Sequence, residues 1–580
     1  MALATLDYVI IIFFTLLILG VGLSFRNTAG KSIESFFLGG RNLPWWIAGT
    51  SMVATTFAAD TPLAVTELVA QSGIAGNWLW WNMLAGGMLT TFFFAKYWRR
   101  ANILTDVELV EIRYSGKAAS ILRGFKAVYL GLFLNSLVIG WVNVALMSLI
   151  KVFFNIPDDQ LLWCTALAMT IVVIYSATSG LLGVAFTDVI QFLMAMTGSV
   201  VLAYLVLDAK QVNGIAGLKS SLPESSFSFF PQIGNADASG VATTLSLSLG
   251  SFLAFIGIQW WASWYPGNEP GGGGYVAQRM MSAKSEKDAV YATLFFQIAH
   301  YCIRPWPWII VALAAVVLYP DLPADDKKLG YVMAMKDYLP DGLRGLLLVA
   351  FFAAYMSTIS TQLNWGTSYL INDVYKRYIK PEATERQFVM ASRVGTLIVM
   401  LISLYATSQI TNISGVWQFL MECGAGLGMV LILRWYWWRV NAWSEITATI
   451  APFIGYSIAR YGLDMEFPNS FFLTVGFTTV AWIFVTLITK PTEDSILHKF
   501  YDRIQPRGSW GPYQNDANSG ELGYLTICWL AAIALAYCIL FFTGSAIFGD
   551  WVMVGVYSAI IIISGIVLRT FANKVKIFDD

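Results

Sequence analysis

The chain has 580 residues, of which 57% are hydrophobic and only 12% are charged, and its formal net charge at pH 7 is zero. Soluble domains have about 25% charged residues, so this composition excludes a soluble protein and predicts an integral membrane protein. The balanced charge gives no information about partners, and no motif for nucleic-acid binding, nucleotide binding or lipidation occurs.

Apolar runs of about 20 residues recur along the whole chain, and each is long enough to cross a bilayer as a helix. The runs are continuous rather than alternating, which excludes a transmembrane β-barrel. We therefore predict an all-α integral membrane protein. Its spans, about fifteen, are expected near residues 5–25, 43–72, 78–98, 119–150, 161–180, 184–207, 242–265, 288–319, 342–373, 388–409, 412–433, 441–461, 470–489, 523–543 and 551–570.

The first run, from about Asp7 to Ser24, has no basic residue before it and is followed by Arg26 and Lys31. A secretory signal has the opposite charge order, so we interpret this run as a retained first helix with its N-terminus outside. The odd-numbered connections between spans then hold most of the 36 lysines and arginines, as the positive-inside rule requires of cytoplasmic loops. This predicts a multi-pass protein of the plasma (inner) membrane with a cytoplasmic C-terminus.

Two of the predicted spans are interrupted. The second contains "AADTP" (Ala58–Pro62), and the seventh ends in "WYPGNEPGGGGY" (Trp264–Tyr275), whose prolines and glycines cannot continue a helix. A lipid-tolerated proline kink is the alternative at each position. Because the breaks occupy matching places five spans apart, they favour an inverted-repeat transporter with two discontinuous helices.

This pattern divides the chain into four regions. Residues 1–41 form a peripheral first helix and a cytoplasmic loop, 42–210 the first repeat (core helices 1–5), and 240–440 the second repeat (core helices 6–10). Residues 441–580 are peripheral C-terminal helices with a cytoplasmic loop at 490–523, which is rich in turn formers. The core is thus expected to be a ten-helix, 5+5 inverted repeat of the amino-acid/sodium symporter type.

The ninth predicted span carries four hydroxyl side chains within five residues. Helical residues three or four apart share a face, so three of these hydroxyl side chains form a stripe together with Ala354. The stripe consists of Ala354, Ser357, Thr358 and Thr361, with Ser360 beside it. Such hydroxyls also bond back to the helix or let helices pack closely. A cluster of four favours a site for a hard monovalent cation, which prefers oxygen ligands such as hydroxyls and the carbonyls of a broken helix.

Four motifs resemble the sodium/solute symporter family, which includes bacterial galactose, sialic acid and proline symporters. They are "SFFLGGRNLPWW", "YSATSGLLGVAFTDVIQ", "YVAQRMMSAKS" and "AAYMSTISTQLNWGTSYLINDVYKRY". The resemblance covers about residues 5–440. It implies the ten-helix inverted-repeat core and one or two Na⁺ as coupling ions.

The resemblance also implies a main sodium site. The carbonyls of Ala54 and Phe57, within "SMVATTFAAD", match the family's backbone ligands for this ion. The matching ligands on the facing helix are the carbonyl of Ala354 and the hydroxyls of Ser357 and Thr358.

A second sodium site, used by only some family members, is implied at Asp188, Ser360 and Thr361. All three residues offer suitable oxygen atoms. Asp188 also lies near the start of the predicted span 184–207, where a carboxylate offsets the positive end of a helix and caps it. Both roles remain open for Asp188 at this point.

Asp60 is an ionisable residue inside a membrane segment, and such residues usually mark a pathway or a site. It matches an acid that in relatives touches the sugar or supports sodium binding, and the alternative is a carboxylate that caps the second half-helix. The resemblance implies a substrate pocket around the two breaks. We assign to it Asp60, Thr61, Trp80, Gln259, Trp260, Trp264, His300 and Met421.

Several of these positions depart from the sugar transporters that the chain resembles. Thr61 and Met421 stand where an amide is expected, Trp80 replaces an acidic sugar contact, and His300 stands at a lysine position. A lone membrane histidine is often only a hydrogen-bonding bridge between helices. Sugar specificity is therefore not assumed, because tryptophan faces together with an acid also suit a cation. Glu269, in the longer loop "NEPGGGG", is expected to be solvated.

We predict a sodium-coupled secondary active symporter that imports a small polar organic solute by alternating access. For the identity of the solute, our first expectation is a sugar or sugar-like compound, and our second is an amine or other organic solute. Proton coupling through Asp60, Asp188 or His300 is the alternative. A membrane enzyme or sensor is remote, because His300 and His498 lie far apart, the five cysteines show no metal spacing, and no output domain is present. The expected partners are the solute, sodium ions and the lipid bilayer, and nothing indicates an obligatory protein partner.

Overall fold

The structure is a computed structural model that describes residues 3–25, 38–231, 248–265, 267, 269–513 and 521–579. Arg26, Lys31, the start of the predicted span 242–265, part of the loop 490–523 and the side chains of residues 174–180 lie outside the described residues. The described part contains helices and no strand, which confirms the all-α prediction for it. Within it, eight helices are long and apolar enough to cross a membrane, or nine if the bent pair α22 (Ile413–Cys423) and α23 (Leu427–Tyr436) is one span.

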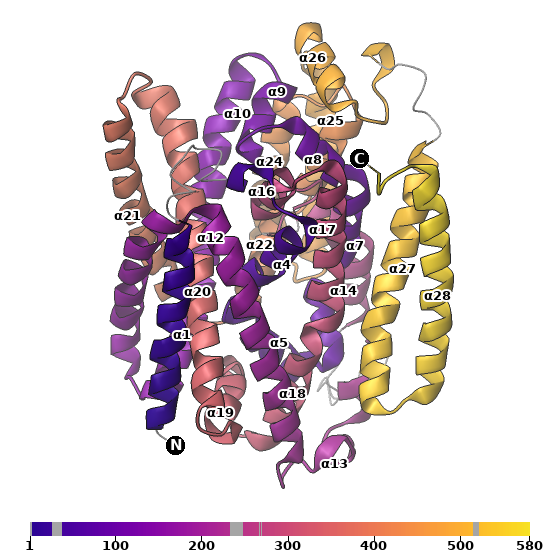
Figure 1. Cartoon of the computed structure of the whole chain (residues 1–580). Helices are drawn as coiled ribbons and strands as arrows, with labels where there is room; N and C mark the ends of the chain where they lie inside the picture. Colours follow the sequence, from indigo (N-terminus) through magenta and orange to yellow (C-terminus); the bar gives the residue numbers. More distant parts are fainter. Residues whose placement is uncertain are drawn as a thin grey trace.

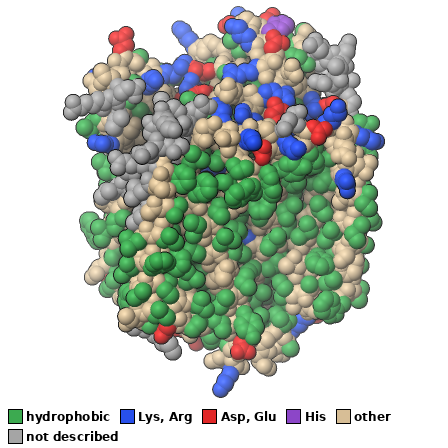
Figure 2. Space-filling view, viewed as in Figure 1, with side chains coloured by type: hydrophobic (Ala, Val, Ile, Leu, Met, Phe, Trp, Pro, Cys, Tyr) green, Lys and Arg blue, Asp and Glu red, His purple; other side chains and the backbone are tan. Residues whose placement is uncertain are grey.

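The helices run roughly side by side, with the N-terminus at one end of the molecule and the C-terminus towards the other (Figure 1). Figure 2 shows a broad apolar band between two polar ends. Lysines and arginines gather at the end where α9, α10 and α26 lie in Figure 1, which we call the basic end. Apolar side chains such as Ile12 on α1 and Ile562 on α28 point outward in this band. An outward apolar surface is expected where a helix contacts lipid chains.

Most helices do not belong to the two interrupted segments. They are α1 (Thr5–Ser24), α6 (Trp78–Trp81), α7 (Met83–Leu89), α8 (Ala95–Ala101), α9 (Leu109–Arg113), α10 (Gly116–Val128), α11 (Asn135–Phe154), α12 (Asp158–Asp208), α13 (Gly214–Ser221), α17 (Glu286–Ile298), α18 (Pro305–Leu318), α19 (Leu329–Tyr338), α20 (Leu343–Ser368), α21 (Glu385–Gln409), α24 (Ala442–Ser457), α25 (Asn469–Ile488), α26 (Asp494–Ile504), α27 (Glu521–Phe548) and α28 (Trp551–Lys574). The π-helical turns η8 (Ala299–Ile303) and η10 (Tyr369–Ile379) continue α17 and α20.

The first break separates α4 (Trp45–Thr55) from α5 (Asp60–Ser72) at residues 56–59. Pro62 lies in the first turn of α5, where its missing N–H costs no intrahelical hydrogen bond. The Thr61 hydroxyl donates to the Thr56 carbonyl across the break at 3.2 Å. The interruption predicted at "AADTP" is therefore present and begins just before that motif.

The second break follows the short helices α14 (Leu249–Ala254), η7 (Phe255–Gln259) and α15 (Trp260–Ala262), and α16 (Gly274–Ser282) begins after it. The described residues between 263 and 273 contain no helix. Gly271 and Gly272 have φ angles of +77° and +78°, and a Cβ on Gly272 would lie 2.4 Å from Trp98 Nε1. Glycine is needed here both for the backbone conformation and for the close approach.

Helices α12 and α20 pack against each other and against α4, which places a long helix on each side of the first break. Residues of both predicted spans, 161–180 and 184–207, are helical within α12. Asp188 lies well inside α12. The predicted cap is not seen among the described residues, because the Asp188 carboxylate accepts from the Ser51 and Ser357 hydroxyls rather than from a helix N–H.

The predicted loop 490–523 contains a helix, α26, and this corrects the sequence analysis. Leu497, Phe500, Tyr501 and Ile504 are its buried residues. Their spacing of three and four residues gives an amphipathic helix with one apolar face. That face packs against α8 and α9 at the basic end.

Candidate functional site

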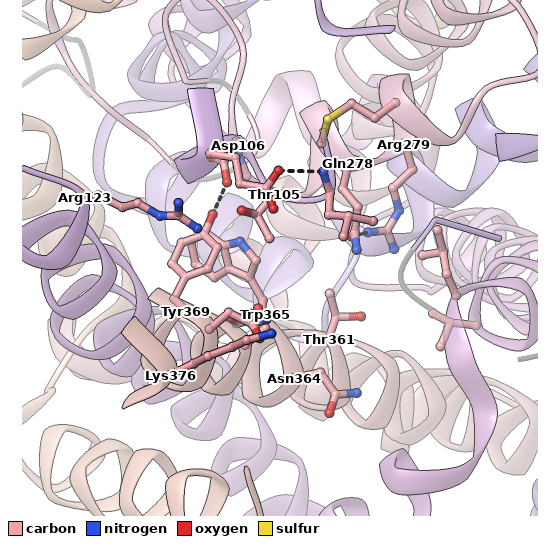
Figure 3. Close-up of a pocket in the computed structure, with 18 of the residues that line it drawn as sticks. Thr105, Asp106, Arg123, Gln278, Arg279, Thr361, Asn364, Trp365, Tyr369 and Lys376 are labelled. Atoms are coloured by element: carbon pink, nitrogen blue, oxygen red, sulfur yellow. Dashed lines mark hydrogen bonds between the residues drawn. The ribbon is translucent and has the colours of Figure 1, made fainter. Parts of the chain in front are cut away.

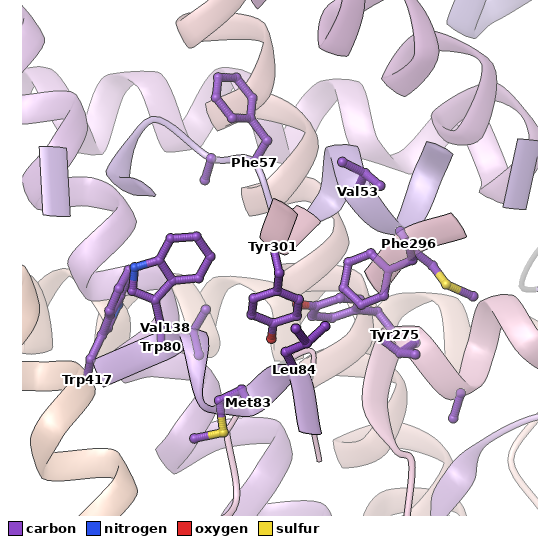
Figure 4. Packing of buried hydrophobic residues seen from close by; sticks show 14 of the residues in the cluster. Val53, Phe57, Trp80, Met83, Leu84, Val138, Tyr275, Phe296, Tyr301 and Trp417 are labelled. Carbon is purple, nitrogen blue, oxygen red and sulfur yellow. The ribbon is translucent and has the colours of Figure 1, made fainter. Parts of the chain in front are cut away.

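A small cavity of about 70 Å³ lies between the two breaks, α11 and α20. Its lining includes four of the eight predicted substrate residues: Asp60, Thr61, Trp80 and His300. Figure 4 shows several aromatic residues of this region, with the Tyr301 ring between Trp80 and Tyr275. The structure therefore brings one carboxylate and several aromatic rings together at the point where both helices are interrupted.

The other four predicted substrate residues lie outside this cavity. Gln259 donates to the Leu79 carbonyl at 3.1 Å and to the Met421 sulfur, so these two predicted residues contact each other. The Trp260 ring packs on Trp529 of α27, with ring centroids 5.4 Å apart. Trp264 is buried, and its backbone lies against Gly424. In this conformation all four pack around the second break and do not line the cavity.

The predicted main sodium residues come from α4 and α20. The Phe57 N–H donates to the Ala54 carbonyl at 2.9 Å in the last turn before the break, and the Phe57 ring lies 5.8 Å from Phe351 of α20. Ala354 and Thr358 are both buried on the facing helix. The Thr358 hydroxyl is buried without a hydrogen-bond partner among the described residues. A buried hydroxyl that bonds nothing is costly, and its chemistry fits a cation ligand.

Asp188 connects three helices. Its carboxylate accepts from the Ser51 hydroxyl of α4 at 2.9 Å and from the Ser357 hydroxyl of α20 at 2.7 Å. Arg279 of α16 donates to the Ser51 hydroxyl at 3.4 Å and to the Thr55 hydroxyl at 3.3 Å. The structure thus joins Asp188 to Ser357, which the sequence assigned to the main sodium site.

Ser360 and Thr361, predicted to share a second sodium site with Asp188, line a larger cavity of about 440 Å³. Figure 3 shows its labelled residues, among them Thr361, Asp106 and Lys376. Asp106 accepts from the Gly274 N–H at 3.0 Å and from the Tyr369 hydroxyl. The cavity therefore extends from the basic side chains of η10 to the hydroxyl stripe of α20, and Ser360 also borders a small cavity beside α12.

His300 bridges two elements. Its Nδ1 lies 3.0 Å from the Thr56 hydroxyl, so it links η8 to the first break. The ring also lies 5.6 Å from the Trp80 ring and 4.3 Å from Tyr301. This geometry supports the bridging alternative for His300.

Sequence reasoning missed Arg304. Its guanidinium is 1% exposed and donates to the Val53 carbonyl at 2.8 Å, to the Thr56 carbonyl at 3.2 Å and to the Thr56 hydroxyl at 3.2 Å. It also lies 5.0 Å from the Trp308 ring centroid. The rule that singled out Asp60, an ionisable residue within a membrane segment, applies equally to this arginine.

Glu269 is 4% exposed, and its Oε2 atom has no hydrogen-bond partner among the described residues. The expectation of a solvated loop is therefore wrong. A Cβ on Gly274 would lie 2.5 Å from the Glu269 carboxylate, which shows how closely the glycine run folds over this side chain. The glycines allow the loop to close on itself and exclude water from the acid.

Comparison with known proteins gives a consistent result. A family model described as the sodium:solute symporter family matches residues 36–451. The chain is 25% identical over 521 residues to a sodium/glucose cotransporter of Vibrio parahaemolyticus, which covers 85% of this chain and 92% of that one. It is also 25% identical over 474 residues to a sodium/sialic acid symporter of Proteus mirabilis, with coverages of 78% and 88%. A solved sodium-coupled sialic acid symporter has a similar fold, with a TM-score of 0.63 at 21% identity over 84% of this chain and 99% of that one.

Proposed function

Because the chain belongs to the sodium:solute symporter family, we propose that it is a sodium-coupled secondary active symporter that imports a small polar organic solute by alternating access. The family and the relatives above are transporters, so the chain is a transporter and not an enzyme. Sodium is its coupling ion and is transported together with the solute. The solute is a sugar-like compound or an amine.

We further propose the finer architecture. About fifteen spans, with residues 42–210 and 240–440 as two inverted repeats of five helices, fit the two breaks and the all-helical fold. Residues 1–41 and 441–580 are then peripheral. The basic end in Figure 2 supports a cytoplasmic C-terminus and an outside N-terminus, because positive charge collects on the cytoplasmic side.

The observation that carries the proposal is the buried Thr358 hydroxyl, which has no hydrogen-bond partner among the residues that the structure describes. We assign the main sodium to the carbonyls of Ala54, Phe57 and Ala354 and the hydroxyls of Ser357 and Thr358. A sodium ion held there bridges α4 and α20 and favours the state in which the two helices are in contact. Coupling is then a difference in sodium affinity between states rather than a mechanical push.

We assign the second sodium to Asp188, Ser360 and Thr361, with one condition. In the described conformation the Asp188 carboxylate is bound by the Ser51 and Ser357 hydroxyls. When sodium binds Asp188, the Ser357 hydroxyl either stays bonded to the carboxylate or leaves it and binds an ion instead. The two sites are in this way linked through one serine.

A sodium titration of the melting temperature of the purified protein tests the function, with potassium replacing sodium at constant ionic strength. A ligand that binds only the folded state raises stability by mass action, by about 2.7 kcal/mol at 100 times its Kd. We expect a saturable rise specific to sodium that is lost in Thr358→Ala. Thr474→Ala is the matched control, because Thr474 is a buried hydroxyl on the distant helix α25 that bonds back to Ser470. Equal responses to sodium and potassium would favour the proton-coupled alternative.

A further inference from the structure

One oxygen atom of the Asp60 carboxylate accepts no hydrogen bond from the described residues. Asp60 is 5% exposed, it lines the 70 Å³ cavity, and its Oδ1 atom has no hydrogen-bond partner in the part of the chain that the structure describes. A carboxylate taken out of water without a partner is strongly unfavourable. At the meeting point of both breaks, this Oδ1 atom lies on a cavity wall and is available to accept from a ligand.

Much of the cavity wall consists of aromatic rings that come from separate elements. The rings of Trp141 and Trp417 lie 6.4 Å apart, the Tyr265 ring lies 6.0 Å from Trp417, and Trp80 stacks on Tyr301 at 5.6 Å. All five line the same cavity as Asp60. The faces of such rings attract cations, most strongly where water is excluded.

Three of the neutral polar groups on the cavity wall are already engaged in hydrogen bonds within the protein. The Thr56 hydroxyl contacts His300 and Arg304, the Thr61 hydroxyl donates to a backbone carbonyl, and Trp80 Nε1 donates to Asn77 at 3.0 Å. A polyol needs several free donors and acceptors arranged around it, because unmet polar groups are costly. Free polar atoms do remain on the cavity-lining side chains, namely Asp60 Oδ1, Gln362 Oε1, Trp417 Nε1 and the Thr358 hydroxyl assigned to sodium.

Arg304 is a basic residue beside the first break, and its hydrogen bonds go to the backbone rather than to Asp60. Its guanidinium bonds the Val53 and Thr56 carbonyls at the end of α4, where the partial charge of a helix is negative. It is 1% exposed and does not line the cavity. Arg304 therefore makes its hydrogen bonds to the end of α4 and interacts with Asp60 only through its charge, so no bond from Arg304 occupies the Asp60 carboxylate.

We propose that the transported solute is a small organic ammonium compound whose cationic group pairs with Asp60 inside this aromatic wall. Gln362 accepts a further hydrogen bond from the solute, and Trp417 donates one to a hydroxyl or carboxylate at its other end. This inference rests on the proposed function, and it replaces the two open solute classes by one.

A pair of isosteric probes in saturating sodium tests it. Choline and 3,3-dimethylbutan-1-ol have the same shape, but only choline is charged. We expect choline to raise the melting temperature saturably and the neutral isostere and glucose to leave it unchanged. In Asp60→Asn the apparent choline affinity falls by about 30-fold or more, because a buried charge loses its partner.

Glu67→Gln is the matched control, because Glu67 is a second buried acid on α5 that bonds Ser414 and does not line the cavity. It should keep the choline response. Three results in the wild type would overturn the ammonium assignment: equal melting-temperature shifts with choline and its neutral isostere, a shift with glucose alone, or no shift with choline. These results can be read even if Asp60→Asn does not fold. The sodium titration is scored separately, so a sodium response without a choline response rejects only the solute class. Absence of a sodium response rejects the proposed function itself.

Discussion

At the scale of single residues, the first break is held by Arg304. An interrupted helix leaves carbonyl groups without N–H partners, and in lipid no water replaces them. The guanidinium satisfies two carbonyls and one hydroxyl of this segment and stacks on Trp308. Arg304 makes no hydrogen bond to the Ala54 or Phe57 carbonyl, the two backbone groups that we assign to the sodium ion.

Replacing Arg304 by methionine should strongly destabilise the protein. The change removes three charge-assisted hydrogen bonds, to the Val53 and Thr56 carbonyls and to the Thr56 hydroxyl, which costs about 3 kcal/mol or more. Arg304→Lys keeps the charge but loses the fork of donors and should lie in between. Melting temperatures in detergent give the order. Arg460→Met is the control, because Arg460 is partly exposed and makes a 3.8 Å ion pair with Glu466 and one 3.2 Å hydrogen bond to the Met465 carbonyl. Equal effects at positions 304 and 460 would refute this role.

At the scale of helices, α26 and the segment after it fasten the basic end. The Trp510 ring stacks on Phe500 of α26, and its Nε1 donates to the Trp435 carbonyl of α23 at 3.1 Å. The Arg113 guanidinium of α9 lies 5.1 Å from the Trp510 ring centroid. This one tryptophan therefore joins three helices that are distant in the sequence.

We expect Trp510→Ala to lower the melting temperature markedly, since truncating a buried Trp typically costs about 3–5 kcal/mol. Trp551→Ala should have little effect, because Trp551 at the start of α28 is 72% exposed. The comparison also tests α26 itself. If both substitutions act alike, the segment does not pack on the core as described.

The sequence predicted the two breaks because proline and glycine act locally, through missing donors and permissive φ angles. It did not predict α26, although residues 497, 500, 501 and 504 have helical spacing, because the turn formers of the following residues dominated the segment. The bond between Asp188 and Ser357 joins residues 169 positions apart, and the burial of Glu269 depends on how the glycine run folds. Such features follow from packing between distant segments, which local patterns do not contain.

At the scale of the whole molecule, the charge distribution and the positions of the termini support the proposed orientation. The basic end contains α9, α10 and α26, and the N-terminus lies at the opposite end (Figures 1 and 2). If this end is cytoplasmic, Lys376 of the larger cavity faces the cytoplasm, and that cavity is the inner route to the hydroxyl stripe. Solute and sodium would leave the protein by this route.

Cysteine labelling tests the orientation. In a Cys164→Ser background, Cys164 being the one native cysteine that is not buried, a cysteine introduced by Lys574→Cys should react with an impermeant maleimide only in inside-out vesicles. One introduced by Asp158→Cys, at the start of α12, serves as a second reporter of sidedness for the same bundle. Labelling of Lys574→Cys in right-side-out vesicles would reverse the orientation.

The most direct test of the account is equilibrium binding of ²²Na⁺ to the purified protein, measured in the wild type and in the Ser357→Ala/Thr358→Ala double variant. We predict saturable binding that unlabelled sodium displaces and potassium does not. The double variant should require at least about tenfold more sodium for half-saturation, which corresponds to about 1.4 kcal/mol. Saturable sodium binding that is unchanged in the double variant would contradict the assigned site, and no saturable binding in the wild type would contradict sodium coupling altogether.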